Sequence, residues 1–304
     1  MSQGGSQDGS MGGDERGGTQ DDESVMFSCR LDNAKAVATI LSCLSHGTRK
    51  DQHAQCEVNE DGMTFLVTGK AKFTQAQGSL GRELFQEFDC DGEGGKFGIN
   101  LTTLLECLQI FGTGSLAQTS VSMAYQEARA MFRLTLEEGG VFTSCEIRTI
   151  YQDEEEMEFS ALAKAFTNKE VVCRCILKSE YLKEPFHELL DVNGSTSVAV
   201  VFGKEAPNLK LSATGSIGSS EIDFPKASEA FVLFECRVRQ ASWTYLMAGM
   251  EVAMRALPHA NETYFRVNEE GILCVQHQIP MSFGQTSYID VLLCPDALEQ
   301  EEEG

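Results

Sequence analysis

The clearest pattern in this chain is the segment Ile99-Asn-Leu-Thr-Thr-Leu-Leu-Glu-Cys-Leu-Gln-Ile-Phe-Gly112. Its leucines recur at the i, i+3, i+4 and i+7 positions of a helix with one apolar face, namely at Leu101, Leu104, Leu105 and Leu108. Asn100 stands directly before the pattern, and asparagine is a favoured N-cap residue. The segment therefore predicts a helix that begins after Asn100 and packs its leucines against a core.

Three further segments have the same apolar spacing, at Val37–Leu44, Leu182–Leu189 and Leu246–Ala253. The patterns start 64 residues apart in each half (37 to 101, 182 to 246), and the second half repeats the first 145 residues later. The simplest explanation is an internal duplication: two domains of one plan, each with two helices. The first helix is expected to open after Asp32–Asn33 and the third at Ser179, although Pro185 then kinks the third helix or delays its start.

The sequence between the helices has the pattern of strands. Apolar residues alternate from Phe132 into Glu137-Glu138-Gly139-Gly140 and alternate again from Val141, which predicts a β-hairpin. Other short apolar runs are Val171–Leu177, Val198–Phe202, Leu209–Ala213, Phe231–Val238, Ile272–Ile279 and Tyr288–Cys294. Consecutive strands follow too closely for βαβ crossovers, so each half is predicted to be an antiparallel α+β domain with two helices on one face.

The charge of −22 is concentrated in three acidic segments. Residues 1–24 and 297–304 are expected to be a solvated Gly-rich extension and an acidic tail, and 151–163, with its run Asp153–Glu158, a connector between domains at 25–150 and 164–296. Such a balance disfavours nucleic-acid binding by bulk electrostatics. Any nucleic-acid role must therefore use a local basic surface or some device other than charge.

No motif predicts a catalytic, cofactor or metal site. Asp89–Gly94 begins like a calcium loop but lacks the glutamate at position 12, and is interpreted as a hairpin turn. Cys173 and Cys175 are interpreted as core thiols, since no second ligand pair is present for zinc, and Gly215–Ser220 joins two strands. Eleven scattered cysteines without a signal sequence or membrane span indicate an intracellular protein with reduced thiols.

Basic residues on the predicted helices are candidates for a binding surface. Lys35 and Arg255 lie opposite the apolar faces of the first and fourth helices, and Lys183 lies to the side of the third. Glu106 opposes this pattern on the second helix. The alternative interpretation is that these cations are ordinary solvated side chains.

The segment Ile99–Gly112 resembles the second helix of the Rad-one type of checkpoint subunit in the sliding-clamp family. Further resemblances, in the same order along residues 25 to 296, are Leu31–Asn33, Leu136–Val141, Gly218–Lys226 and Leu293–Asp296. The resemblance implies the fold of the proliferating-cell nuclear antigen. In that fold two similar domains each place two helices on a central hole and strands on the outside.

The resemblance also implies a role. The chain would join two related but different subunits, of the Rad-nine and Hus-one types, in a nuclear ring. A clamp loader would place the ring on damaged or stalled DNA, and the ring would recruit checkpoint activators and repair enzymes. A closed ring holds double-stranded DNA topologically, without sequence specificity, which reconciles DNA binding with an acidic chain. Lys35, Lys183 and Arg255 would then face the DNA.

In this family the subunits join by edge strands, which implies contacts at about Val141–Thr149 and Leu209–Gly215. The implied interface residues are Val141, Thr143, Cys145, Ile147, Leu209, Leu211 and Ala213. The connector at Tyr151–Glu158 is expected to lie beside a docking surface for partners, or to be a plain tether. Two alternatives remain open: a 3′→5′ exonuclease, a label some family members have carried, and a homo-oligomeric clamp of the replication type.

Overall fold

The structure, a computed structural model, describes residues 25–45, 51–69, 73–92, 94–150 and 161–296. The first half contains β1 (Phe27–Leu31), α1 (Lys35–Leu44), β2 (His53–Asn59), β3 (Gly62–Thr68), β4 (Thr74–Gly81), β5 (Glu87–Cys90), β6 (Gly95–Asn100), α2 (Leu101–Leu108), β7 (Ser120–Gln126), β8 (Met131–Glu138) and β9 (Val141–Arg148).

The second half repeats this order after a short additional helix, α3 (Ala161–Thr167). Its elements are β10 (Val171–Lys178), α4 (Glu180–Leu190), β11 (Ser197–Gly203), β12 (Leu209–Thr214), β13 (Ser219–Phe224), β14 (Phe231–Cys236), β15 (Gln240–Leu246), α5 (Met247–Met254), β16 (Glu262–Asn268), β17 (Leu273–Pro280) and β18 (Thr286–Leu293). The predicted internal duplication is therefore visible element by element.

The sheet topology repeats in the same way. One sheet has the order β5-β1-β7-β8-β9, another β13-β12-β11-β15, and the third, nine-stranded sheet runs β14-β10-β16-β17-β18-β4-β3-β2-β6. The nine-stranded sheet is the second copy of the first sheet joined to the first copy of the four-stranded sheet. An antiparallel ladder of β18 on β4, with Val291 opposite Ala76, makes this join between the two halves.

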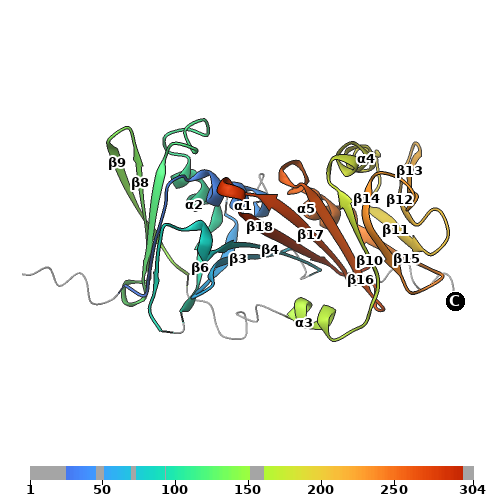
Figure 1. Ribbon diagram of the computed structural model, residues 1–304, viewed down its shortest axis with the longest axis horizontal. Helices are drawn as coiled ribbons and strands as arrows, with labels where there is room; N and C mark the ends of the chain where they lie inside the picture. Colours follow the sequence, from blue (N-terminus) through green and yellow to red (C-terminus); the bar gives the residue numbers. More distant parts are fainter. Residues whose placement is uncertain (1–24, 46–50, 70–72, 93, 151–160, 297–304) are drawn as a thin grey trace, which may run out of the picture.

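Figure 1 shows α1, α2, α5 and α4 along one side of the sheets, with α3 on the opposite side. The predicted apolar faces of the first two helices point into the core: Val37, Ile40, Leu41 and Leu44 of α1 are all fully buried, as are Leu101 and Leu104 of α2. The fourth pattern is only partly correct, because Leu246 precedes α5 and is 42% exposed. The two helices of each half contact each other, α1 with α2 and α4 with α5. The predicted α+β architecture with paired helices is confirmed.

The local predictions about helix ends are partly correct. Asn100 Oδ1 accepts a hydrogen bond from the Thr103 backbone N–H at 2.8 Å, which confirms the N-cap of α2. Ser179 occupies the N-cap position of α4, but its side chain does not cap the helix. Pro185 lies inside α4 and does not delay its start. The residue before α1 is Ala34, which has no side chain that could cap.

The predicted turns also divide into two groups. Gly139 and Gly140, with φ of 58° and 83°, close the β8–β9 hairpin as expected, because glycine reaches left-handed conformations without a steric penalty. The hairpin interpretation of Asp89–Gly94 is wrong, since β5 pairs with β1 whereas β6 pairs with β2 in another sheet.

Cys173 and Cys175 are buried in the core, as expected. The predicted extension, acidic run and tail lie outside the described residues, and the domain limits remain predictions.

Candidate DNA-facing helices and subunit edges

Two of the three predicted DNA-facing cations are exposed on the helix side of the molecule. Lys35 is the first residue of α1 and is exposed. Lys183 is exposed on α4, where its ammonium group donates to the Pro258 carbonyl oxygen at 3.4 Å. Both side chains are therefore accessible to a DNA phosphate.

Arg255 is half-buried and therefore differs from the two exposed lysines, and its role in facing DNA remains a prediction. It follows α5 directly, and its guanidinium donates to the backbone carbonyl oxygen of Ser45 at 2.5 Å. Burial lowers the pKa of Arg255, an effect partly opposed by Glu251 and Cys43. The helical period places Arg255 on the same face as Ala248 and Glu251, which are the exposed residues of α5, so Arg255 remains partly accessible to solvent while it binds Ser45 at the end of α1.

The exposed side chains of this helix layer include several acids. Glu106 on α2 is exposed, as the sequence predicted, and so are Glu180 and Glu184 on α4 and Glu251 on α5. Among the described residues, the layer therefore carries mixed charge rather than a basic track. Strong, localised phosphate binding is not what this surface provides.

The strand β9 lies at the edge of its sheet, as predicted for Val141–Thr149. It pairs with β8 on one side, and in the described part of the chain its other side carries no ladder. Val141 and Phe142 are 58% and 66% exposed, Thr143 and Cys145 are half-buried, and Ile147 is buried. A long edge with apolar side chains at one end is a surface that another strand can extend.

The second predicted edge, Leu209–Gly215, is wrong by one strand. β12 pairs with β11 on one side and β13 on the other, and Leu209, Leu211 and Ala213 are buried. The edge of this sheet is β13, which exposes Glu221 and Asp223. The alternation of apolar residues identified β12 as a strand, but it could not tell an inner strand from an edge.

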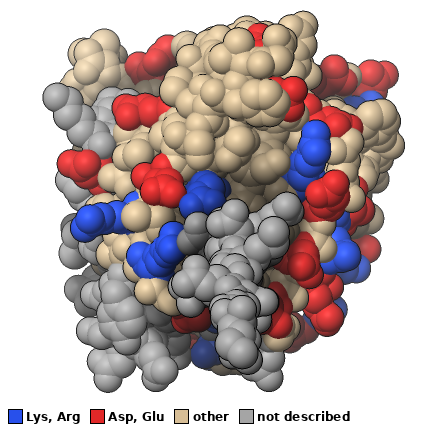
Figure 2. All heavy atoms as spheres, turned by 90° about the vertical axis from the view of Figure 1, so that its left-hand side faces the viewer, with Lys and Arg blue, Asp and Glu red and all other residues tan. Residues whose placement is uncertain are grey.

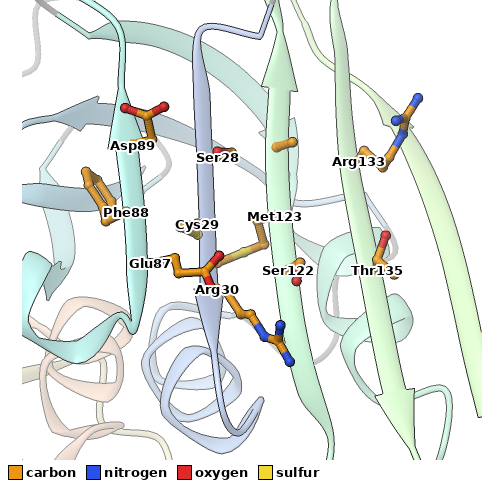
Figure 3. Close-up of a pocket in the computed structure, with 11 residues that line it drawn as sticks. Ser28, Cys29, Arg30, Glu87, Phe88, Asp89, Ser122, Met123, Arg133 and Thr135 are labelled. Carbon is orange, nitrogen blue, oxygen red and sulfur yellow. The ribbon is translucent and has the colours of Figure 1, made fainter. Parts of the chain in front are cut away.

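The outer face of the first sheet contains a hollow of about 620 Å³. Its floor consists of small side chains, including Ser28, Ser122 and Ala124, and Figure 3 shows Arg30 extending over it toward Ser122 while Arg133 points away. Arg133 binds Glu146 at 3.1 Å. Figure 2 shows this end of the molecule, with acidic and basic side chains interspersed. The lining is of mixed charge, with Glu87 and Asp89 beside Arg30 and Arg133.

No group of three or more His, Cys, Asp or Glu side chains in the described ranges is arranged to hold a metal ion. None of the described helices is long and apolar enough to cross a membrane. The features that stand out are thus the helix layer and the two strand edges.

The helix α3 was missed in the sequence analysis. It packs Phe166 against Ile272, Cys274 and Leu292 on the sheet face opposite the other helices, and Arg266 lies over the Phe166 ring at 5.6 Å from its centroid. Its sequence, Ala-Leu-Ala-Lys-Ala-Phe, is rich in good helix formers, which is the signal that could have predicted it.

The model of one protein family, described as repair protein Rad1/Rec1/Rad17, matches residues 26–279. The chain belongs to the Rad1 family. It is 33% identical over 285 residues to the human cell cycle checkpoint protein RAD1, a match that covers 93% of this chain and 96% of that protein. It is 23% identical over 300 residues to the DNA damage checkpoint control protein rad1 of Schizosaccharomyces pombe, covering 91% and 89% of the two chains.

A more distant Rad1 relative is the checkpoint protein RAD1 homolog mrt-2 of Caenorhabditis elegans, 22% identical over 273 residues, or 90% of this chain and 96% of that one. These matches confirm the family, and with it the two-domain clamp fold and the role of a checkpoint clamp subunit that the sequence predicted. In the Rad1 family, then, the paired helices and free edges described above are parts of a clamp subunit.

Proposed function

We propose that this chain is one subunit of a three-membered ring that encircles double-stranded DNA in the nucleus, and that its two neighbours are related but different subunits of the Rad-nine and Hus-one types. In this role a clamp loader opens the ring on damaged or stalled DNA, and the loaded ring recruits checkpoint activators and repair enzymes. The chain acts as a structural platform and carries out no reaction itself.

One observation carries this proposal: the strand order of the duplicated halves. In the second half the sheet β14-β10-β16-β17-β18 ends at β18, which pairs with β4 at the end of the sheet β4-β3-β2-β6. The counterparts of these two strands, β9 and β13, end the two remaining sheets and have no such partner within the described chain. The β18–β4 pairing therefore indicates what each free edge accepts. β9, the counterpart of β18, is expected to pair with a strand like β4, and β13, the counterpart of β4, with a strand like β18.

The ladders allow this equivalence to be followed residue by residue. From Cys29 in β1, successive cross-strand partners lead through β7 and β8 to Cys145 in β9. From Cys175 in β10, the same steps lead through β16 and β17 to Val291 in β18. Cys145 thus occupies the place of Val291, which faces Ala76 across the internal join. An antiparallel strand of a neighbouring subunit is expected at the corresponding position.

The two free edges differ in chemistry, which favours different neighbours. β9 carries exposed Val141 and Phe142, whereas β13 carries exposed Glu221 and Asp223. A ring built from unlike edges is heterologous, and each edge can select its own partner. A homotrimer would join the same two unlike edges head to tail, so the argument against the homo-oligomeric alternative is the absence of Lys and Arg from α2, which a homotrimer would repeat three times.

The helix layer supports topological rather than adhesive holding of DNA. Exposed Lys35 and Lys183 are offset by exposed acids such as Glu106 and Glu251. With few phosphate contacts, DNA binding is weak and depends little on salt, which suits a ring that slides. Sequence reading is not expected, since loose contacts to phosphates carry no sequence information.

Sedimentation of the purified chain, alone and mixed with its two related subunits, tests the proposal. The chain alone should sediment as a monomer, and the mixture as a complex containing one copy of each subunit. A homotrimer of the single chain, or no complex in the mixture, would contradict the heterotrimer. Magnesium-dependent release of nucleotides from DNA 3′ ends by the chain alone would instead support the exonuclease alternative.

A further inference from the structure

The most unusual exposed side chain in the molecule is Phe283, in the short 3₁₀ turn η5 (Ser282–Gly284) between β17 and β18. It is 92% exposed, more than any other large apolar side chain in the described residues. Its φ of 58° is left-handed, a region that bulky residues rarely occupy and that costs roughly 1 kcal/mol or more. An almost fully exposed side chain on a strained backbone contributes nothing to the stability of the isolated chain.

The turn is held in place by specific contacts. The Met281 backbone N–H donates to the Gln285 carbonyl oxygen at 2.9 Å, and Gln285 N–H donates to the Ser282 carbonyl oxygen at 3.2 Å. The Gln285 side-chain amide donates to the carbonyl oxygen of Glu83, in the turn η2 (Arg82–Leu84) of the other half. The position of Phe283 is therefore built, and Figure 1 shows the β17–β18 turn beside α1.

Phe283 borders a hollow of about 130 Å³ between this turn, η2 and the start of α1. At about 30 Å³ per water molecule the hollow has room for roughly four waters. One side chain fits into this space, whereas the backbone of a helix or a strand does not. Its apolar floor includes buried Leu31 and Phe85. Occupation by a single inserted side chain is the arrangement that this size permits.

The polar lining defines which side chain fits. It consists of two carboxylates, three carboxamides and a hydroxyl, and no Lys or Arg is among the described residues of the lining: Asp32, Glu83, Asn33, Gln86, Gln285 and Ser282. Of the nearby cations, Lys35 lines an adjoining hollow that shares Asn33 and Ser282 with this one, and Arg82 lies over the Phe88 ring at 5.3 Å from its centroid. The site thus offers hydrogen-bond acceptors, negative charge and one aromatic face.

We propose that the hollow beside Phe283 receives an arginine side chain of a partner protein. The planar guanidinium stacks on the Phe283 ring, and its N–H groups bind the Asp32 carboxylate and the side-chain amide oxygens of the lining. The Glu83 carboxylate, which lies against Gly81, adds negative charge nearby. A nucleic acid fits less well, since two carboxylates at the hollow repel phosphate, although an exposed aromatic ring can also stack on a base. The proposal does not depend on ring assembly, because the hollow is formed within one chain.

The test titrates the full isotope-labelled chain with the peptide acetyl-Gly-Arg-Gly-amide and follows the side-chain amide signals of Asn33, Gln86 and Gln285 by NMR. The same peptide with citrulline, which keeps the shape and loses the charge, is the matched ligand. The expected result is a weak but saturable shift of these signals, at least about fivefold weaker with citrulline. A thymidine oligonucleotide is titrated in parallel.

Two substitutions at one position separate recognition from folding. Phe283→Tyr keeps the ring and should retain arginine binding within about twofold. Phe283→Asn removes the ring in a residue that tolerates left-handed φ, so it should weaken binding about fivefold while leaving thermal stability equal or higher. The control Ile217→Asn alters another exposed apolar side chain, in the β12–β13 turn, and should change nothing.

Equal binding of the arginine and citrulline peptides, no saturable shift, or full binding by Phe283→Asn would overturn the proposal. Shifts at these amides with the oligonucleotide alone would overturn it in favour of a nucleic-acid contact. None of these outcomes bears on whether the chain assembles into a ring, which sedimentation measures separately.

Discussion

The guanidinium of Arg255 donates a hydrogen bond to the backbone carbonyl oxygen of Ser45, 2.5 Å away and 210 residues earlier in the chain. Ser45 is the C-cap of α1, and Arg255 follows the last residue of α5. The bond places a positive charge at the carbonyl end of α1, where the helix dipole favours cations. It joins one helix of each half across the middle of the molecule.

Arg255→Ala should therefore weaken folding rather than DNA retention. Loss of a hydrogen bond from a charged, half-buried donor is expected to lower the free energy of unfolding by about 1.5–3 kcal/mol. Urea unfolding measures this, with Lys183→Ala as the control that should stay within about 0.5 kcal/mol of wild type. Wild-type stability combined with weaker DNA retention would return Arg255 to the DNA-facing surface.

Charge reversal at Lys35 and Lys183 should act on DNA alone. In the assembled ring on linear duplex, each lost phosphate contact lowers the slope of log retention against log salt by about 0.9. Assembly is checked first by sedimentation and should be unaffected, since both side chains are exposed. Unchanged salt slopes would show that the two lysines are ordinary solvated side chains.

His277 links three elements in the core of the second half. Its Nε2 lies 2.6 Å from the Ala253 carbonyl oxygen, an acceptor, so this nitrogen carries the proton. Nδ1 then accepts from the Thr263 hydroxyl at 3.0 Å, which in turn accepts from the Ser179 hydroxyl at 2.9 Å. This explains why Ser179, at the N-cap position of α4, does not cap the helix.

The neutral state of His277 should make folding sensitive to acid. Burial lowers its pKa from an ordinary 6.5 to about 4, so the unfolded chain binds a proton that the folded chain resists. The stabilisation is complete above pH 6.5 and is lost as the pH falls toward 4, by about 3 kcal/mol. Urea unfolding between pH 7.5 and about 4.5 should show a shallower pH dependence for His277→Gln than for wild type. Equal slopes for wild type and His277→Gln would contradict the prediction.

Proline in the free edges should block assembly without unfolding the chain. In an antiparallel strand the N–H direction alternates, so one residue of each adjacent pair points its N–H outward. Single substitutions at Thr143 and Ser144 in β9, and at Glu221 and Ile222 in β13, test both directions. One variant of each pair should fold normally and fail to enter the heterotrimer. Leu211→Pro is the contrasting control, which should disrupt folding because β12 is paired on both sides.

Asn100→Ala should remove the cap of α2. Its carboxamide oxygen satisfies the Thr103 N–H, and replacing such a cap by alanine costs about 1 kcal/mol. Asn100→Asp keeps an acceptor and should restore most of the loss. Thermal unfolding distinguishes the two variants, and equal melting temperatures would show that the cap is unimportant.

The local elements of this protein are determined by its own sequence. Leu101, Leu104 and Leu108 are buried in α2 because the helical period puts them on one face, and Asn100 caps the helix through its own side chain. Gly139 and Gly140 close the β8–β9 hairpin because glycine adopts the left-handed turn without a steric penalty. These outcomes depend on residues within a few positions of each other, so periodicity and residue type suffice to predict them.

The site depends on contacts that periodicity does not encode. Whether Leu211 lies in an inner strand or at an edge depends on β13 pairing beside it, and the group that Arg255 binds, the Ser45 carbonyl, lies in the other half of the chain. Phenylalanine is a residue type usually found in the core, yet Phe283 is exposed, and the long-range contact of Gln285 with Glu83 holds its turn at the surface. Alternation and helical phase fix directions relative to one element, whereas exposure is decided by what the rest of the chain packs against it.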